Sequence, residues 1–146
     1  MDNFSDGGHK QTITNDGKYG TLRNMRIVSG KVIHGRGYGR KLGFPTANID
    51  RREYSRKGYR FKYGIYGGVA VIVATGKRFA AGIVIGPDDA RGLPHIEAHL
   101  LRFSGNLYGK EIELSLEKYL RPFYQYDSEE KLKRQIRKDI SAVREL

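Results

Sequence analysis

The segment HGRGYGRKLGFPTAN, residues 34–48, combines four glycines with three cationic side chains. Glycine lets a backbone adopt positive φ and approach a ligand closely, while Arg36, Arg40 and Lys41 place positive charge beside it. These properties suit a phosphate-binding loop. It is not a Walker loop, because G-x-x-x-x-G-K-[ST] is absent, and no strand-to-helix context supports a dinucleotide fingerprint. A flexible barrel turn has the same composition, so both interpretations stay open.

Thr46 and Asn48 follow Pro45 at a spacing that suits metal binding. Two residues apart on an extended chain, their side chains lie on the same side. A hydroxyl and an amide oxygen are hard ligands, and Mg²⁺ in proteins needs few of them when substrate phosphates and water complete its shell. Threonine and asparagine after proline are also ordinary turn residues, which is the alternative.

Glu97 is an acid within an apolar segment, residues 95–103. On a strand, Ile96 and Ala98 would face one side and Glu97 and His99 the other. An acid in such a place is either paired, as in a salt bridge at the rim of a barrel, or functional. His95, Glu97 and His99 share a face and resemble a metal site, but H-I-E-A-H is not H-E-x-x-H and helical zinc spacing does not apply to a strand.

Residues 119–126, YLRPFYQY, place four aromatic side chains around Arg121. Such a cluster can stack a planar ring, and the arginine can add a cation–π contact. A core-closing hinge and a platform for single-stranded bases are the alternatives.

The chain has a formal net charge of +11, and residues 31–62 contribute +8 of it. This charge indicates an anionic partner, such as a phosphorylated small molecule, a nucleic acid or a membrane surface. A solvated basic surface that keeps the protein soluble is the alternative.

Short apolar segments alternate with glycine-bearing turns from Met25 onwards, at residues 27–33, 64–74, 79–85, 95–103 and 111–120. This spacing predicts five or six antiparallel strands in a small barrel of Greek-key type, because closure removes exposed edges. The strict alternation over residues 111–117 is the clearest strand. Residues 1–22 lack apolar periodicity and are predicted to be a flexible leader, so that one domain spans residues 23–146.

The last segment changes to a helical period, with Leu132, Ile136, Ile140 and Val143 three or four residues apart. This pattern predicts one amphipathic C-terminal helix. Asp127 is the expected N-cap, with Glu130 closing a capping box. The absence of cysteine, of a signal peptide and of a long apolar run indicates a cytoplasmic protein without membrane spans.

The glycine-rich segment and the motifs that follow it resemble the riboflavin kinase family, including the kinase half of the bifunctional riboflavin kinase/FAD synthetases. The matching pattern is H-G-x-G-x-G-R-x-L-G-F-P-T-A-N, and the other matches follow in the family's order: GIY at 64–66, IEAHLL at 96–101, LYG at 107–109, YLRP at 119–122 and YDS at 126–128. Together with matches in the C-terminal helix they span residues 26–140. The resemblance implies a mainly β, six-stranded antiparallel Greek-key barrel with a C-terminal α-helix.

The resemblance also implies an activity, the transfer of the γ-phosphate of Mg-ATP to the 5′-hydroxyl of riboflavin, giving FMN and ADP. Glu97 would be the catalytic base. Thr46 and Asn48 would bind Mg²⁺, with Zn²⁺ or Mn²⁺ as alternative ions. The nucleotide-binding residues implied are Gly35, Arg40, Thr46, Leu100, Arg102 and Tyr108, and the flavin-binding residues are Arg121, Tyr124 and Tyr126.

The chain departs from the family pattern in a few places. Residues 87–94 replace the usual Asn-Pro-Thr-like turn, Arg102 stands where an aspartate is frequent, and Tyr126 replaces the usual phenylalanine. No adenylyltransferase segment precedes the barrel, so this chain is expected to make FMN and not FAD, as a monomer.

Two other functions compete with the kinase. One is a non-catalytic flavin-binding or regulatory module, which the altered segment 86–94 would favour. The other, less favoured, is a basic barrel that binds nucleic acid, which predicts salt-dependent binding to oligonucleotides and indifference to riboflavin.

Overall fold

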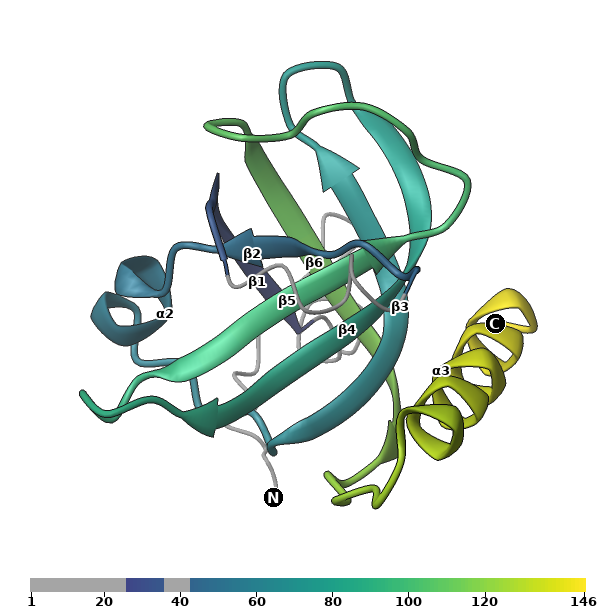
Figure 1. The fold of residues 1–146 in the computed structure, drawn as a ribbon. Helices are drawn as coiled ribbons and strands as arrows, with labels where there is room; N and C mark the ends of the chain where they lie inside the picture. The colour runs from purple at the N-terminus through teal and green to yellow at the C-terminus, as the bar shows by residue number, and fades with distance from the viewer. Residues whose placement is uncertain (1–25, 36–42) are drawn as a thin grey trace, which may run out of the picture.

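The chain forms six β-strands followed by a C-terminal helix (Figure 1). The computed structural model describes residues 26–35 and 43–146, and the predicted leader, residues 1–22, lies outside them. The elements are β1 (Ile27–Ile33), β2 (Ala47–Ile49), α2 (Arg52–Arg56), β3 (Gly64–Ile72), β4 (Lys77–Asp88), β5 (Pro94–Leu100), β6 (Glu111–Arg121) and α3 (Glu129–Arg144).

The strands close into an antiparallel barrel in the order β1-β2-β5-β4-β3-β6. Consecutive strands β3, β4 and β5 pair as neighbours, and β6 returns to lie beside β3, which is the strand order of a Greek key. The predicted six-stranded Greek-key barrel with a C-terminal helix is therefore confirmed.

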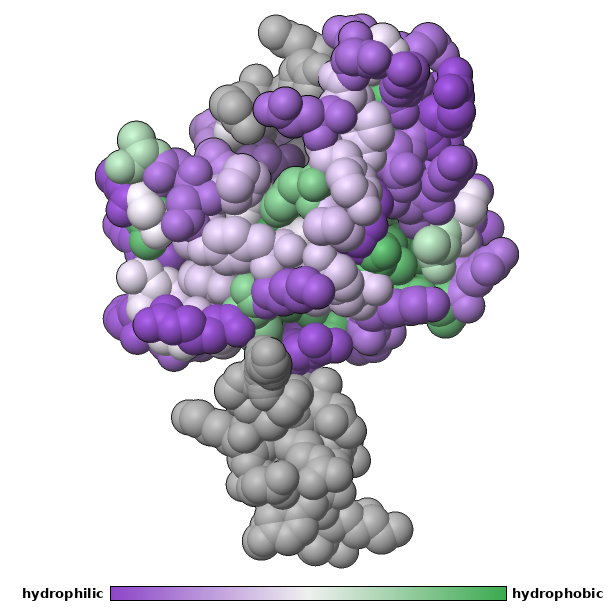
Figure 2. Space-filling model, turned by 90° about the horizontal axis from the view of Figure 1, so that it is seen from below, coloured by the Kyte–Doolittle hydropathy of each residue, from purple (hydrophilic) through white to green (hydrophobic). Residues whose placement is uncertain are grey.

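Strand β6 shows how the alternation in the sequence builds the core. Ile112, Leu114 and Leu116 are buried inside the barrel, while Glu111 and Glu113 are exposed. Full burial of each such aliphatic side chain contributes about 1.5–3 kcal/mol to folding. The outer surface carries mainly hydrophilic residues, as Figure 2 shows for one face, where apolar residues form only small separate areas.

Helix α3 packs beside the barrel on β3 and β4. It begins after Ser128, whose Oγ accepts a hydrogen bond from the backbone N–H of Lys131 at 3.1 Å. The prediction of Asp127 as N-cap was wrong by one residue, and the Asp127 carboxylate instead forms an exposed ion pair with Lys131 Nζ at 3.0 Å. No helix of the described residues is long and apolar enough to cross a membrane.

Candidate functional site

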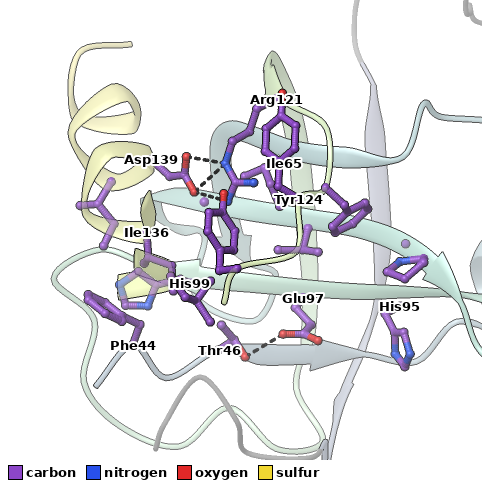
Figure 3. Close-up of a pocket in the computed structure, with 18 of the residues that line it drawn as sticks. Phe44, Thr46, Ile65, His95, Glu97, His99, Arg121, Tyr124, Ile136 and Asp139 are labelled. Atoms are coloured by element: carbon purple, nitrogen blue, oxygen red, sulfur yellow. Dashed lines mark hydrogen bonds and ion pairs between the residues drawn. The ribbon is translucent and has the colours of Figure 1, made fainter. Parts of the chain in front are cut away.

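A cavity of about 320 Å³ opens between α3 and the barrel (Figure 3). Its barrel side is formed by residues of β2, β4 and β5, and its other side by the segment after β6 and by α3. Leu132, Ile136 and Ile140 line it, whereas only Val143 of the predicted apolar stripe is fully buried. The stripe on α3 thus serves mainly as a cavity wall.

Thr46, Asn48 and Glu97 meet on the barrel side of this cavity. Asn48 on β2 lies directly opposite Glu97 on β5 in the antiparallel register. The Thr46 hydroxyl donates a hydrogen bond to Glu97 Oε1 at 3.2 Å. Because Ala47 and Ile49 point into the core, alternation along β2 turns Thr46 and Asn48 outwards together.

Among the described residues, Glu97 does not form the rim salt bridge that the sequence left open. Within residues 26–35 and 43–146, no lysine, arginine or histidine nitrogen lies within salt-bridge distance of its carboxylate, and only Oε1 accepts a side-chain hydrogen bond. Ile96 and Ala98, its neighbours in sequence, are fully buried on the opposite face. The other carboxylate oxygen, Oε2, therefore has no side-chain partner in the described part of the chain.

Gly35 lies directly against the side chain of Asn48. A Cβ atom added at Gly35 would be 2.1 Å from Asn48 Nδ2 and 2.4 Å from Oδ1, far inside van der Waals contact. The amide of Asn48 therefore occupies the space that the side chain of any other residue at position 35 would need. This steric conflict explains why position 35 requires glycine.

A second cavity, of about 220 Å³, adjoins the first and is lined by His34, Gly35, Asn48 and Arg51, among others. The Tyr108 ring lies against that of His34, with centroids 3.7 Å apart and the planes tilted by 31°, so two of the residues predicted to bind nucleotide, Gly35 and Tyr108, lie on this side.

Thr46, which was also predicted to bind nucleotide, lines the main cavity, while Leu100 and Arg102 line neither cavity. The Leu100 side chain belongs to the barrel core and is 7% exposed, on the face of β5 opposite to Glu97. Arg102 is exposed in the turn after β5, with φ of 62°. Arg40 lies outside the described residues.

The residues predicted to bind flavin, Arg121, Tyr124 and Tyr126, all line the main cavity. Tyr124 is 60% exposed. The hydroxyl of Tyr126 is buried and has no hydrogen-bond partner among the described residues. The Arg121 guanidinium lies 6.0 Å from the Tyr126 ring centroid.

Arg121 also forms a two-point ion pair with Asp139 of α3, with Nε–Oδ1 at 3.0 Å and Nη2–Oδ2 at 2.8 Å. Burial lowers the pKa of Arg121, but the hydrogen bonds and charge of Asp139 outweigh this effect and raise it above its usual value. Gln135 donates a further bond to Asp139 Oδ1 at 3.0 Å. This network ties the end of β6 to α3.

Sequence reasoning matched Asp139 to the family pattern without giving it a role. The sequence did contain a sign that Asp139 has a role. Position 139 falls on the apolar stripe of α3, seven residues after Leu132 and three after Ile136. A carboxylate on the packed face of a helix needs a partner.

The turn that departs from the family pattern, residues 86–94, is held by Asp88 and Asp89. Asp89 Oδ1 accepts the backbone N–H groups of Arg91 and Leu93 at 2.8 and 3.1 Å, and the Leu93 bond contributes most to lowering the pKa of this carboxyl. Arg51 Nη1 lies 2.7 Å from Asp89 Oδ2, and the Tyr63 hydroxyl donates to Asp88 Oδ1 at 2.5 Å. The altered turn is therefore tied to the barrel, and its Gly86 and Pro87 line the main cavity.

The basic segment is partly neutralised where the structure describes it. Four of its cations lie within 4 Å of carboxylates, in the pairs Arg51–Asp89, Arg52–Asp50, Arg56–Glu53 and Lys57–Glu53. The Arg52, Arg56 and Lys57 side chains are exposed, so their pairs contribute little to stability, whereas Arg51 and Asp89 are only 15% and 16% exposed. These pairs reduce the local positive potential, which favours a solvated surface over a nucleic-acid site, and the expectation that nucleic acid is not a partner stays a prediction.

The chemistry of the donors fits a hard cation beside phosphate groups. The Thr46 hydroxyl and the Asn48 amide offer oxygen ligands of the kind that Mg²⁺ takes in small number. No group of three His, Cys, Asp or Glu side chains suited to a metal occurs in the described part of the chain, so His95, Glu97 and His99 do not form one.

Comparisons with known proteins identify the family of this chain. The family model described as riboflavin kinase matches residues 22–146. The chain is 36% identical over 123 residues to the RNA-binding riboflavin kinase RibR of Bacillus subtilis, which covers 82% of this chain and 50% of that protein. It is 40% identical over 121 residues to the bifunctional riboflavin kinase/FMN adenylyltransferase of Buchnera aphidicola, covering 80% of this chain and 37% of that protein.

Solved structures support the fold. A riboflavin kinase from Trypanosoma brucei aligns with a TM-score of 0.56 at 23% identity, over 82% of this chain and 77% of that chain. A Streptococcus pneumoniae structure titled a macrolide-efflux protein aligns with a TM-score of 0.73 at 21% identity, over 93% of this chain and 50% of that chain. The chain spans half the length of the Bacillus relative and 37% of the Buchnera relative. Since the family model covers residues 22–146, the chain belongs to the riboflavin kinase family.

Proposed function

We propose that this domain transfers the γ-phosphate of ATP, with a divalent metal ion, to the 5′-hydroxyl of riboflavin, giving FMN and ADP. The observation that carries the proposal is the meeting of Glu97, Thr46 and Asn48 in one cavity. Phosphoryl transfer needs positioning and charge neutralisation more than covalent chemistry, and these three side chains supply a proton acceptor and metal ligands in one place.

Riboflavin would occupy the main cavity. Its volume of about 320 Å³ lies within the range of roughly 300–1,000 Å³ usual for small-molecule sites. Tyr124 and Tyr126 offer aromatic faces for the isoalloxazine ring, and Ile136 and Ile140 offer apolar contacts. Arg121 supports this wall through its bond to Asp139.

ATP would approach from the second cavity, beside Gly35 and the Tyr108–His34 stack. Asn48 lines both cavities and lies opposite Glu97, so the phosphate chain would reach the acceptor hydroxyl at this point. The predicted contacts of Leu100, Arg102 and Arg40 with the nucleotide remain part of the proposal.

Glu97 would accept the proton of the riboflavin 5′-hydroxyl. The Thr46 hydroxyl donates to Oε1, and Oε2, which no described side chain contacts by a hydrogen bond, would accept from the incoming hydroxyl. Thr46 and Asn48 would also hold the metal, and their hard oxygens suit Mg²⁺ or Mn²⁺ better than Zn²⁺. Bound there, Mg²⁺ supplies charge neutralisation to the phosphates.

Metal removal tests this assignment. The wild-type chain should convert riboflavin to FMN with Mg-ATP, as measured by chromatography, and excess EDTA should abolish the conversion because the phosphates lose their counter-charge. Added Mg²⁺ should restore it, and Mn²⁺ and Zn²⁺ in parallel assays rank the ions. Undiminished FMN formation in EDTA would contradict the metal role of Thr46 and Asn48.

Gly35→Ala should lower kcat/KM for ATP at least about tenfold, because the new methyl group displaces the Asn48 amide and a misplacement of about 1 Å can cost 10²-fold in rate. Steady-state kinetics at saturating riboflavin measure the effect. The matched control is Gly76→Ala in the turn between β3 and β4, where an added Cβ meets nothing within 4 Å. Its positive φ should cost about 1 kcal/mol of stability without changing kinetics. Equal kinetics for the two variants would refute the steric argument.

Two properties of the enzyme belong to the same proposal, a monomeric state and a cytoplasmic location. The non-catalytic flavin module and the nucleic-acid-binding barrel remain the competing functions. Neither uses the arrangement of Thr46, Asn48 and Glu97, which is the reason to prefer the kinase.

A further inference from the structure

His95 lies at the boundary between the two cavities. Only Asn48 and His95 line both of them among the described residues. Asn48 already has a proposed role in metal binding and a steric one against Gly35. The imidazole of His95 has no role so far, although it lies where a group that passes from one cavity to the other would move.

The backbone turns His95 towards the reacting groups. On β5 the fully buried Ile96 separates it from Glu97, so the two side chains project on the same side of the strand (Figure 3). Residues two apart on a strand are about 7 Å apart. The riboflavin hydroxyl bound to Glu97 and the phosphoryl group that it attacks, which accepts a hydrogen bond of about 3 Å from His95, fit between them.

The neighbouring strand β4 pairs irregularly with β5 beside His95. Strand β4 pairs with β5 at Ile85↔Ile96 and again only at Asp88↔Pro94, with an irregularity in between that lies opposite His95. Such bulges are frequent next to active sites, where they re-aim side chains or interrupt pairing.

The contacts of His95 differ from those of His99, two positions after Glu97. His99 Nδ1 lies 2.8 Å from the carbonyl oxygen of Pro45, and its ring meets Phe44 edge to face at 6.1 Å. His95 makes no side-chain hydrogen bond and no ring contact with any residue of 26–35 or 43–146. The contacts of the described residues thus explain why a histidine stands at position 99, but they do not explain the histidine at position 95.

We infer that His95 donates a hydrogen bond to the phosphoryl group as it passes from ATP to riboflavin. An imidazole offers an N–H donor whether neutral or protonated. A donor aimed at the charge on the transferring group stabilises the transition state more than either bound substrate. The inference rests on the proposed function, because only phosphoryl transfer brings such a group to this boundary.

Kinetics of His95→Ala and His95→Gln test the inference. Removal of one aimed donor should lower kcat about 10- to 100-fold in the alanine variant. The dissociation constant of riboflavin, from quenching of flavin fluorescence, should change less than about twofold, and His95→Gln should recover part of kcat because its amide donates. His99→Ala serves as the contrast, since it should lower the melting temperature while His95→Ala leaves it within about 2 °C.

Several results would overturn the inference. One is a kcat for His95→Ala within about twofold of wild type. Another is a loss in kcat that is equally large in His95→Ala and His95→Gln and that comes with an equal loss of riboflavin affinity. That result would make His95 a packing or flavin-binding residue. If the wild-type chain itself makes no FMN, both the proposed function and this inference fail. If the wild type and His95→Ala are equally active, only this inference fails.

Discussion

Replacing Glu97 with glutamine should lower kcat for FMN formation about 100-fold or more, because the amide cannot accept the proton of the riboflavin hydroxyl. The substitution keeps the size of the side chain. It also keeps an oxygen that can accept the Thr46 hydrogen bond, now 3.2 Å long, so the geometry of the site should persist. Riboflavin should bind with nearly unchanged affinity. The loss therefore belongs to the chemical step.

The measurement is kcat at saturating Mg-ATP and riboflavin, together with riboflavin affinity from fluorescence quenching. Glu113→Gln is the matched control, since Glu113 is an exposed glutamate on β6 that faces away from the core. That variant should have wild-type kinetics. A kcat for Glu97→Gln within about threefold of wild type would remove Glu97 from the proposed chemistry.

Asp139→Ala should lower the free energy of unfolding by about 3 kcal/mol, because it leaves the Arg121 guanidinium buried without its partner. The two side chains are only 14% and 12% exposed, and they are joined at 2.8 Å. The substitution also frees α3 from the end of β6. Since both elements form the wall of the main cavity, riboflavin affinity should fall as well.

Urea unfolding measures the change in stability, with Asp127→Ala as the control. The Asp127–Lys131 pair is 76% and 57% exposed, so its loss should cost less than about 1 kcal/mol. The double variant Arg121→Met/Asp139→Leu should regain most of the stability, because no unpaired charge remains. If Asp139→Ala costs no more than Asp127→Ala, the pair does not hold α3 on the barrel.

Local patterns predicted the parts of this fold that depend on local physics. The alternation around Ile112 and Leu114 identified β6, and the period of Leu132, Ile136 and Ile140 identified α3. The N-cap was misplaced because Asp127 and Ser128 are both good caps, and the register of the first turn decides between them. A propensity argument alone cannot make that choice.

The contacts that build the site are long-range and were not predictable in the same way. Gly35 meets Asn48 only because β1 pairs with β2, and Thr46 meets Glu97 only because β2 pairs with β5. The resemblance to the riboflavin kinase family indicated most of the site residues but not how their side chains contact one another. It also named Leu100, whose side chain the barrel closure places in the core.

The position of His95 illustrates the same limit. From sequence, His95, Glu97 and His99 are three equivalent residues on one strand face. The Pro45 carbonyl engages His99, whereas β4 pairs irregularly with β5 opposite His95. The first contact comes from a residue distant in the chain and the second from the way two strands pair, and no spacing rule contains either.

The proposed activity is the transfer of a phosphoryl group from ATP to riboflavin. Incubation of the wild-type chain with γ-³²P-labelled ATP, Mg²⁺ and riboflavin tests this activity, with labelled FMN and ADP quantified by chromatography. Labelled FMN should form in amounts equal to the ADP. A folded chain that binds riboflavin but yields no labelled FMN would refute the kinase activity and favour a flavin-binding regulatory module, and a chain indifferent to riboflavin that binds oligonucleotides would favour the basic barrel.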